Sequence, residues 1–308
     1  MNSLPVVFDA KNSLFSFQLS FKRTDGHDIK MEAVYQDTSP GGSSVGTVIA
    51  LHGSPGSHVD FKYITPILVK KGIRVIGVNW PGFGLSEDHE DLRHDNEERC
   101  VFVETLLRSI DVNDRVMWMA HSRAGENGLI LAARNPDRTI GTILITPFGL
   151  RIHHSIVPFS RIENLRNLHD IFPPMRIVLD SVMGKQYNLI GLRVRNGRHA
   201  MSAIKTLHTV GLERNHESVQ TLNRIRPGKL LLIYAGEDFI VDTDISQEFA
   251  AAFEDRTHLA FLEDNKFACT VEYTNGEHFL QKHAAHFIVN GIDAMFEVEN
   301  KRKSRPKL

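Results

Sequence analysis

Residues 115–134, RVMWMAHSRAGENGLILAAR, join a short apolar run to a longer segment with helical periodicity. A nearly unbroken apolar run of this length is typical of a strand buried on both faces. Ser122 stands at the junction, with the small residues Ala120 and Ala124 two positions on either side. A serine at a sharp strand-to-helix turn needs small neighbours, because the backbone passes close to other chain segments there. The pattern predicts a nucleophile elbow at Ser122, although a helix N-cap would also favour serine.

The same kind of apolar run recurs along the chain. It appears in TVIALHG (47–53), RVIGVNW (74–80), TILITP (142–147), KLLLIYAG (229–236) and, more weakly, ACTVEYTN (268–275). Segments of helical length separate the runs, at about 59–71, 95–110, 123–135, 243–254 and 280–298. Residues 14–38 add two alternating strands around an Asp-Gly turn. We therefore predict an α/β fold with a mostly parallel eight-stranded sheet and helices on both faces.

The alternation is interrupted between the fourth and fifth of the parallel strands. A stretch of this length without strands predicts an inserted helical cap at 148–227, between core segments 1–147 and 228–299. From Arg151 to Gly228 there are ten Arg and two Lys against five acids. This basic excess indicates a solvated face, or arginines at an entrance that favour substrates with a carboxylate or phosphate. We expect residues 300–308 to be a disordered basic tail.

Composition narrows the class of protein. The 308 residues are 42% hydrophobic and 24% charged, with a net charge of −1. This is ordinary globular composition, and it argues against attraction of the whole surface to nucleic acid or anionic membrane, although a local patch remains possible. No apolar run is long enough for a membrane span. Two separated cysteines and an N-terminus without a targeting pattern indicate the cytoplasm.

Cofactor and metal motifs are not evident in the sequence. The sixteen histidines form no ligand pair with a suitable third member, and Gly82-Phe83-Gly84 lacks the glycine-rich phosphate fingerprint. We therefore expect no metal and no cofactor. The oligomeric state does not follow from the sequence.

Three further loops follow predicted strands. In His52-Gly53-Ser54-Pro55-Gly56, the Ser54 N–H could form an oxyanion hole with the N–H of Arg123, while His52 braces the loop. Asp238 follows the fifth parallel strand and His278 the sixth. The chain order Ser122, Asp238, His278 is that of the α/β-hydrolases and differs from the order in other serine-hydrolase folds.

Other acids lie close to these positions in the sequence. Glu237 and Asp242 are the alternative acids near Asp238. Glu237 is expected to point away from the side that Asp238 faces, and Asp242 to cap the helix at 243–254. Glu126, four residues after Ser122, is expected to form a surface ion pair rather than to act in catalysis.

HGSPGS, NWPGFGLSE, AHSRAGENG, AGEDFIV and GEHFLQKH together resemble the landmarks of the α/β-hydrolase superfamily, over about residues 47–299. HGSPGSHVDFKYI and HSRAGEN more specifically resemble a nematode group of α/β-hydrolases of unassigned function. The resemblance implies Ser122 as nucleophile, Asp238 as acid, His278 as base, and Ser54 and Arg123 as oxyanion donors. The superfamily often has aspartate in place of Asn79 and glycine in place of Ala120 and Ala124. Epoxide hydrolases and haloalkane dehalogenases also resemble HGSPG but use an aspartate nucleophile.

From these residues we expect a serine hydrolase that acts on an ester, thioester or amide of a small molecule. Two alternatives are an iminopeptidase-like peptidase and a binding protein that retains the triad without turnover.

Overall fold

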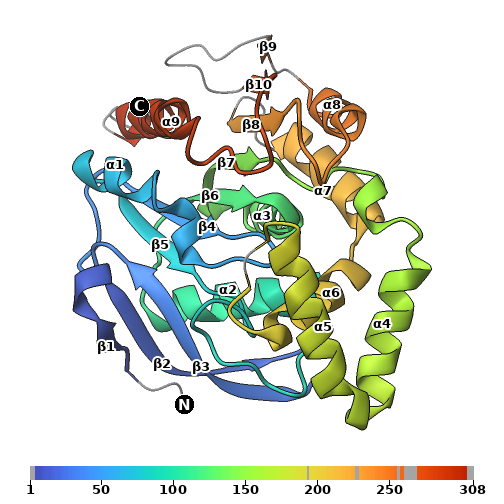
Figure 1. Cartoon of the computed structure of the whole chain (residues 1–308). Coiled ribbons are helices and arrows are strands. Elements are labelled where there is room, and N and C mark those ends of the chain that lie inside the picture. The colour runs from blue at the N-terminus through green and yellow to red at the C-terminus, as the bar shows by residue number, and fades with distance from the viewer. Residues whose placement is uncertain (1–3, 193, 226–228, 255–256, 260–268, 304–308) are drawn as a thin grey trace.

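The computed structural model describes residues 4–192, 194–225, 229–254, 257–259 and 269–303 (Figure 1). One twisted sheet runs through the molecule, with strand order β1-β2-β3-β5-β4-β6-β7-β8-β10-β9. The strands are β1 (Val6–Asp9), β2 (Leu14–Lys22), β3 (Asp28–Asp37), β4 (Thr47–Leu51), β5 (Arg74–Val78), β6 (Val116–His121), β7 (Thr139–Ile145), β8 (Leu230–Ala235), β9 (Thr257–Leu259) and β10 (Cys269–Tyr273). The pairs β1/β2, β2/β3 and β3/β5 are antiparallel and all the others are parallel.

The predicted fold class is confirmed. All eight expected strands are present, as β2 to β8 and β10. The described sheet has two more strands, β1 and β9, one at each edge. They have four and three residues. Runs this short carry too little alternation to be distinguished from loops in the sequence.

Helices cover both faces of the sheet. They are α1 (Thr65–Lys70), α2 (Asn96–Ser109), α3 (Gly125–Arg134), α4 (Ser160–Ile171), α5 (Arg176–Leu189), α6 (Gly197–His208), α7 (Leu212–Ile225), α8 (Thr243–Ala251) and α9 (Ala285–Lys303). The apolar sides of α1 and α9 pack in one core, and those of α2, α3 and α8 in the other. Adjacent residues of one strand, such as Val48 and Ile49, belong to different cores. This burial on both sides explains the apolar runs.

Two predicted helix boundaries were wrong. Residues 59–71 form a 3₁₀ turn, His58–Phe61, and then the separate short helix α1, which has Pro66 in its first turn. The last helix begins at Ala285 and not at residue 280, so His278 lies in a loop. The same helix continues to Lys303, which contradicts the predicted disorder of residues 300–303. Residues 304–308 lie outside the described residues.

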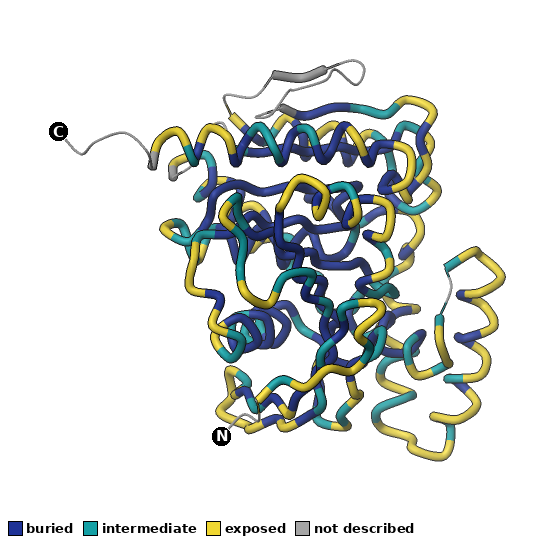
Figure 2. Tube along the Cα trace, turned by 90° about the vertical axis from the view of Figure 1, so that its left-hand side faces the viewer, coloured by how far each residue is buried: buried dark blue, intermediate teal, exposed yellow. Residues whose placement is uncertain are grey.

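The insertion between β7 and β8 is helical, as expected. It contains α4, α5, α6 and α7. Helices α4 and α5 stand at the outer edge of the molecule, and Figure 2 shows that their turns are largely exposed. The division into a core and a cap at residues 148 and 227 stays a prediction.

Candidate active site

Ser122 lies at the carboxyl end of β6, where the strand turns directly into a 3₁₀ turn and then into α3. Its φ is +54°, a conformation that side chains other than glycine rarely adopt and that is typical of a nucleophile elbow. A Cβ atom at Gly53 would come within 3.1 Å of the Ser122 Cβ. Gly53 therefore allows the loop after β4 to approach the serine.

The sheet topology brings these two loops together. β4 and β6 are neighbours in the sheet, and the chain leaves β4 towards β5 on one side and β6 towards β7 on the other. Ligand sites in open parallel sheets form at this switch point, beyond the carboxyl ends of the strands.

The structure brings Ser122, Asp238 and His278 together. The His278 Nε2 lies 2.8 Å from the Ser122 Oγ, and the His278 Nδ1 lies 2.7 Å from the Asp238 Oδ2. A carboxylate can only accept here, so the His278 Nδ1–H donates to it and leaves Nε2 free to accept the serine proton. The arrangement can transfer a proton from the serine to the imidazole.

Main-chain contacts hold the acid and the imidazole in place. The Asp238 Oδ1 accepts hydrogen bonds from the N–H groups of Ile240 and Val241, at 2.8 and 3.1 Å. The His278 carbonyl accepts from the Thr146 Oγ1 at 2.9 Å and faces the His121 Nε2 at 3.2 Å. The first contacts stabilise the Asp238 loop internally, and the second attach the His278 loop to β6 and to the residue that follows β7.

Asp238 is held in its charged form. Burial alone would raise the pKa of the carboxyl, but the hydrogen bond and charge of His278 and two N–H donors outweigh it, so the pKa lies below its ordinary value. The side chains of Asp238 and His278 are each 2% exposed. An ionised acid that orients the imidazole is what general-base catalysis requires.

Two more histidines lie close to His278. Burial, with the charge of His278, lowers the pKa of His121 to about 3 and that of His153 to about 4. The His153 Nδ1 pairs with the Ser155 Oγ at 2.7 Å, and its buried Nε2 has no hydrogen-bond partner. His153 could not be predicted from the sequence, because an adjacent His-His pair in a loop carries no signal of its surroundings.

Ser54 and Arg123 line the same cavity as Ser122 and His278. Ser54 follows β4, and Arg123 follows the serine at the start of the 3₁₀ turn. Both residues therefore border the cavity into which the Ser122 hydroxyl opens. Their role as N–H donors stays a proposal.

The Arg123 side chain forms a buried network that the sequence did not reveal. Its guanidinium donates to the Thr206 carbonyl, to the Asn96 Oδ1 and to the Glu126 carboxylate. Arg123 and Glu126 are both 1% exposed, so the predicted surface pair of Glu126 is a buried one. A paired charge is tolerated there because further hydrogen bonds surround it. The network joins the elbow to the inserted helices.

The alternative acids lie elsewhere. Glu237 is exposed, and its expected direction away from the side that Asp238 faces stays a prediction. Asp242 occupies the N-cap position of α8 without a capping side-chain bond. Its carboxylate instead accepts from the His154 N–H at 2.9 Å and lies 2.6 Å from the His154 Nδ1. The predicted capping role of Asp242 is therefore wrong, because the loop after β7 brings the N–H and the imidazole of His154 to the Asp242 carboxylate.

His52 braces its own loop. Its Nδ1–H donates to the Gly53 carbonyl at 2.7 Å, and its Nε2 accepts from the Trp80 N–H at 3.2 Å. The residue is fully buried, and burial holds its pKa well below the ordinary value. Both ring nitrogens are thus occupied, which agrees with the bracing role expected from the sequence.

A cavity of about 670 Å³ opens at the Ser122 hydroxyl. Its walls are mainly apolar and come from the core loops and from α4, α5 and α6. They include Phe148, Ile162, Leu165, Met183, Tyr187, Ile204, Leu207 and Val241. Of the arginines that the structure describes in the insertion, Arg161 lines this cavity. An apolar chamber with few polar groups is typical of small-molecule sites.

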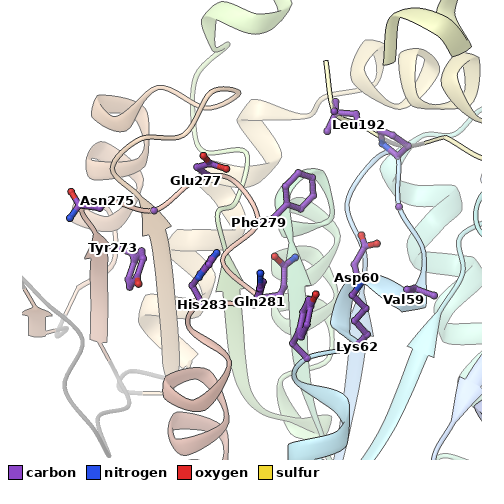
Figure 3. Close-up of a pocket in the computed structure, with 16 residues that line it drawn as sticks. Val59, Asp60, Lys62, Leu192, Tyr273, Asn275, Glu277, Phe279, Gln281 and His283 are labelled. Atoms are coloured by element: carbon purple, nitrogen blue, oxygen red, sulfur yellow. The ribbon is translucent and has the colours of Figure 1, made fainter. Parts of the chain in front are cut away.

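A second cavity, of about 540 Å³, lies beside the first (Figure 3). The two share Pro55, Leu192 and Phe279 in their walls. The second cavity contains none of the three residues of the Ser–His–Asp array. We therefore place the chemistry in the first cavity.

Among the described residues, no cluster of three or more His, Cys, Asp or Glu side chains could hold a metal ion. No helix in the described ranges is long and apolar enough to cross a membrane.

Known proteins resemble this chain either over most of its length or over a part of it. A Caenorhabditis elegans protein described as uncharacterized, F35H12.5, is 29% identical over 298 residues, which cover 87% of this chain and 82% of that protein. A haloalkane dehalogenase of Psychrobacter cryohalolentis is 32% identical over 120 residues, 37% of each chain.

Solved structures share the fold. The structure of an esterase from Thermogutta terrifontis matches this one with a TM-score of 0.61 at 14% sequence identity. The match covers 94% of this chain and 97% of the esterase chain. The family model described as "Alpha/beta hydrolase of unknown function (DUF1057)" matches residues 12–297. A match over this length shows that the chain belongs to this α/β-hydrolase family.

Proposed function

We propose that this protein is a serine hydrolase that cleaves an ester, thioester or amide bond of a small molecule through an acyl-enzyme. The observation that carries the proposal is the contiguous array Asp238–His278–Ser122, with both contacts at hydrogen-bond length. The array opens into an apolar cavity large enough for a small substrate.

The chemistry runs in two steps. The Ser122 Oγ attacks the acyl carbon while His278 Nε2 takes its proton, and the N–H groups of Ser54 and Arg123 stabilise the oxyanion. The bond to the leaving group breaks, and the leaving group receives the proton from His278. Water, deprotonated by His278, then attacks the acyl-enzyme and releases the acid. Each oxyanion donor contributes roughly 3 kcal/mol to transition-state stabilisation in enzymes of this kind.

Labelling with a fluorophosphonate probe tests the proposal. We expect the wild type to react and Ser122→Ala to lose all labelling. Ser155→Ala is a matched control, because Ser155 lines the same cavity but its hydroxyl pairs with His153. A folded wild type that never reacts would favour a binding protein without turnover.

The substrate class follows from a second assay. A panel of aryl esters, acyl thioesters, anilides and N-terminal proline amides should give turnover that depends on Ser122. Preference for the proline amides would favour the peptidase alternative over the esterase.

A further inference from the structure

Large apolar side chains are exposed on the outer turns of α4 and α5. Ile177 is 80% exposed, Leu189 is 87% exposed, and Ile171 is 78% exposed. Their exposed apolar neighbours are Leu168, Phe172, Val178, Val182 and Ile190. We call these eight residues the apolar face. In Figure 2 this part of the molecule is the exposed edge that stands away from the sheet. Several large apolar side chains exposed on two neighbouring helices are typical of an interaction site.

The apolar face leads to the mouth of the active-site cavity. Val178, Val182 and Leu189 are spaced by four and seven residues, so they lie along one side of α5. Leu189 and its neighbour Ile190 also line the cavity at Ser122. On the opposite side of the cavity, Phe239 and Phe279 are also partly exposed and apolar. The mouth is therefore bordered by apolar side chains that continue onto α5.

Cations accompany the apolar face. Arg161, Arg176, Lys185, Arg195 and Arg198 are exposed on or beside α4, α5 and α6. Of the acids in α4 and α5, Asp170 pairs with Arg166 and Lys205, and Asp180 lies 3.2 Å from the His169 Nε2, whereas Glu163 is exposed. In the sequence, residues 151–228 carry ten Arg and two Lys against five acids, although the net charge of the whole chain is −1. Among the described residues of the segment 160–208, these five exposed cations therefore outnumber the one exposed acid, Glu163.

From this combination we propose that the apolar face docks the protein on an anionic lipid membrane and that the substrate enters the cavity from the lipid. Aliphatic side chains enter the acyl boundary while arginine and lysine pair with the headgroups. The docking itself does not depend on catalysis. The choice of a membrane-dissolved ester or thioester as substrate rests on the proposed hydrolase function.

A second copy of the chain fits this surface less well. A symmetric dimer through the apolar face would bring the same cations of both copies together. Arg176 and Lys185 lie on α5 itself, so their repulsion would oppose the contact. Anionic lipid complements both the apolar residues and the charge.

Vesicle binding tests the docking. Purified protein is mixed with vesicles of phosphatidylcholine, with or without phosphatidylserine, and separated by flotation. We expect binding to the phosphatidylserine vesicles, weakened by salt because headgroup attraction is screened. Ile177→Ser with Val178→Ser should weaken binding by at least about tenfold, since both aliphatic contacts are lost. Val69→Ser with Val298→Ser, at exposed valines of α1 and α9, is the matched control and should bind like the wild type.

Three further measurements separate the outcomes. Ile177 and Val178 do not line the cavity, so the double variant should hydrolyse a water-soluble ester at the wild-type rate. Ser122→Ala should bind vesicles like the wild type, which keeps the docking test independent of the proposed chemistry. Sedimentation without lipid detects a dimer.

The proposal is overturned if the wild type does not float with phosphatidylserine vesicles, or if the Ile177/Val178 variant floats equally well. A dimer that only this variant disrupts would assign the face to a second copy.

Discussion

The Arg123 guanidinium donates two hydrogen bonds to the main-chain oxygen of Thr206, at 3.0 Å from Nε and 2.8 Å from Nη2. Thr206 lies in the inserted helix α6, and its own hydroxyl lies 2.8 Å from the Ser54 Oγ. One residue of the insertion thus contacts both residues whose N–H groups we propose as oxyanion donors. From these contacts we expect the position of α6 to affect the proposed oxyanion hole.

Thr206→Val tests this coupling. The Thr206 hydroxyl donates to the Ala203 carbonyl and can therefore accept from Ser54, whereas valine offers no acceptor at nearly the same volume. The Arg123 contacts to the main-chain oxygen remain. We expect kcat to fall about tenfold with little change in KM, because a displaced donor weakens the transition state most.

Thr206→Ser provides the control for the same position. It keeps the hydroxyl, so kcat should stay near the wild-type value. The unfolding midpoints of both variants are measured alongside. If Thr206→Ser loses as much kcat as Thr206→Val, packing and not the hydrogen bond to Ser54 is responsible.

Asp238→Asn should abolish most of the activity without unfolding the protein. Asparagine can donate a hydrogen bond to the His278 Nδ1, and the imidazole then carries its own proton on Nε2. A protonated Nε2 cannot accept the proton of Ser122. In well-studied triads this change lowers kcat by up to ~10⁴-fold. Steady-state kinetics and a melting curve measure the two effects.

Asp242→Asn is the matched comparison. Asp242 contacts His154 and not His278, so kcat should stay within about threefold of the wild type. Our assignment of the acid fails if Asp242→Asn loses activity while Asp238→Asn retains it.

The stability of the protein should fall as the pH drops below the ordinary histidine pKa. Burial lowers the pKa of His121 from 6.5 to about 3, so between these values the unfolded chain binds a proton that the folded chain does not. The stabilising contribution of the neutral ring is complete about one pH unit above 6.5, and well below 6.5 it decreases by about 1.4 kcal/mol for each pH unit.

His121→Gln isolates this contribution, because glutamine does not titrate and can still donate to the His278 carbonyl. Between about pH 6.5 and pH 5.5, the wild type should lose about 1 kcal/mol more unfolding free energy than the variant. Burial raises the pKa of Asp60 and Glu98 to about 7, which gives the opposite slope, but equally in both proteins. Urea titrations at both pH values make the measurement. Parallel losses would show that His121 does not titrate as proposed.

The sequence allowed the prediction of the sheet and the chain positions of the site, because both follow from local patterns. Burial on both faces produces apolar runs, and Ser122, Asp238 and His278 each follow such a run. The start of α9 was predicted too early, since residues 280–284 have helical periodicity but belong to the loop that carries His278. Its extension to Lys303 was missed because a basic segment resembles a frayed end.

Contacts between distant side chains could not be predicted in this way. The ion pair of Arg123 and Glu126 has the i,i+3 spacing of a surface pair, and only the packing of α6 over it makes it buried. Asn79 is a second case. Its Nδ2 donates to the Val34 carbonyl while its Oδ1 accepts from the His58 N–H, so the amide serves two partners that an aspartate could not both satisfy. Such relationships depend on the assembled fold.

Ala120 and Gly128 compensate each other in side-chain size at the elbow, and the last prediction concerns this pair. Many α/β-hydrolases have glycine at the position of Ala120, whereas here the methyl group is buried in β6. A Cβ at Gly128, in α3, would lie 2.8 Å from the Ala120 Cβ, which is too close for two carbon atoms. We expect Gly128→Ala to lower the unfolding free energy by ~1 kcal/mol or more, although alanine favours helix. Ala120→Gly with Gly128→Ala should restore it, since the contact is then relieved and the gain in helix propensity remains. A double-mutant cycle by urea denaturation gives the coupling energy. A single Gly128→Ala variant more stable than the wild type, or a coupling energy near zero, would show that the two positions do not compensate each other.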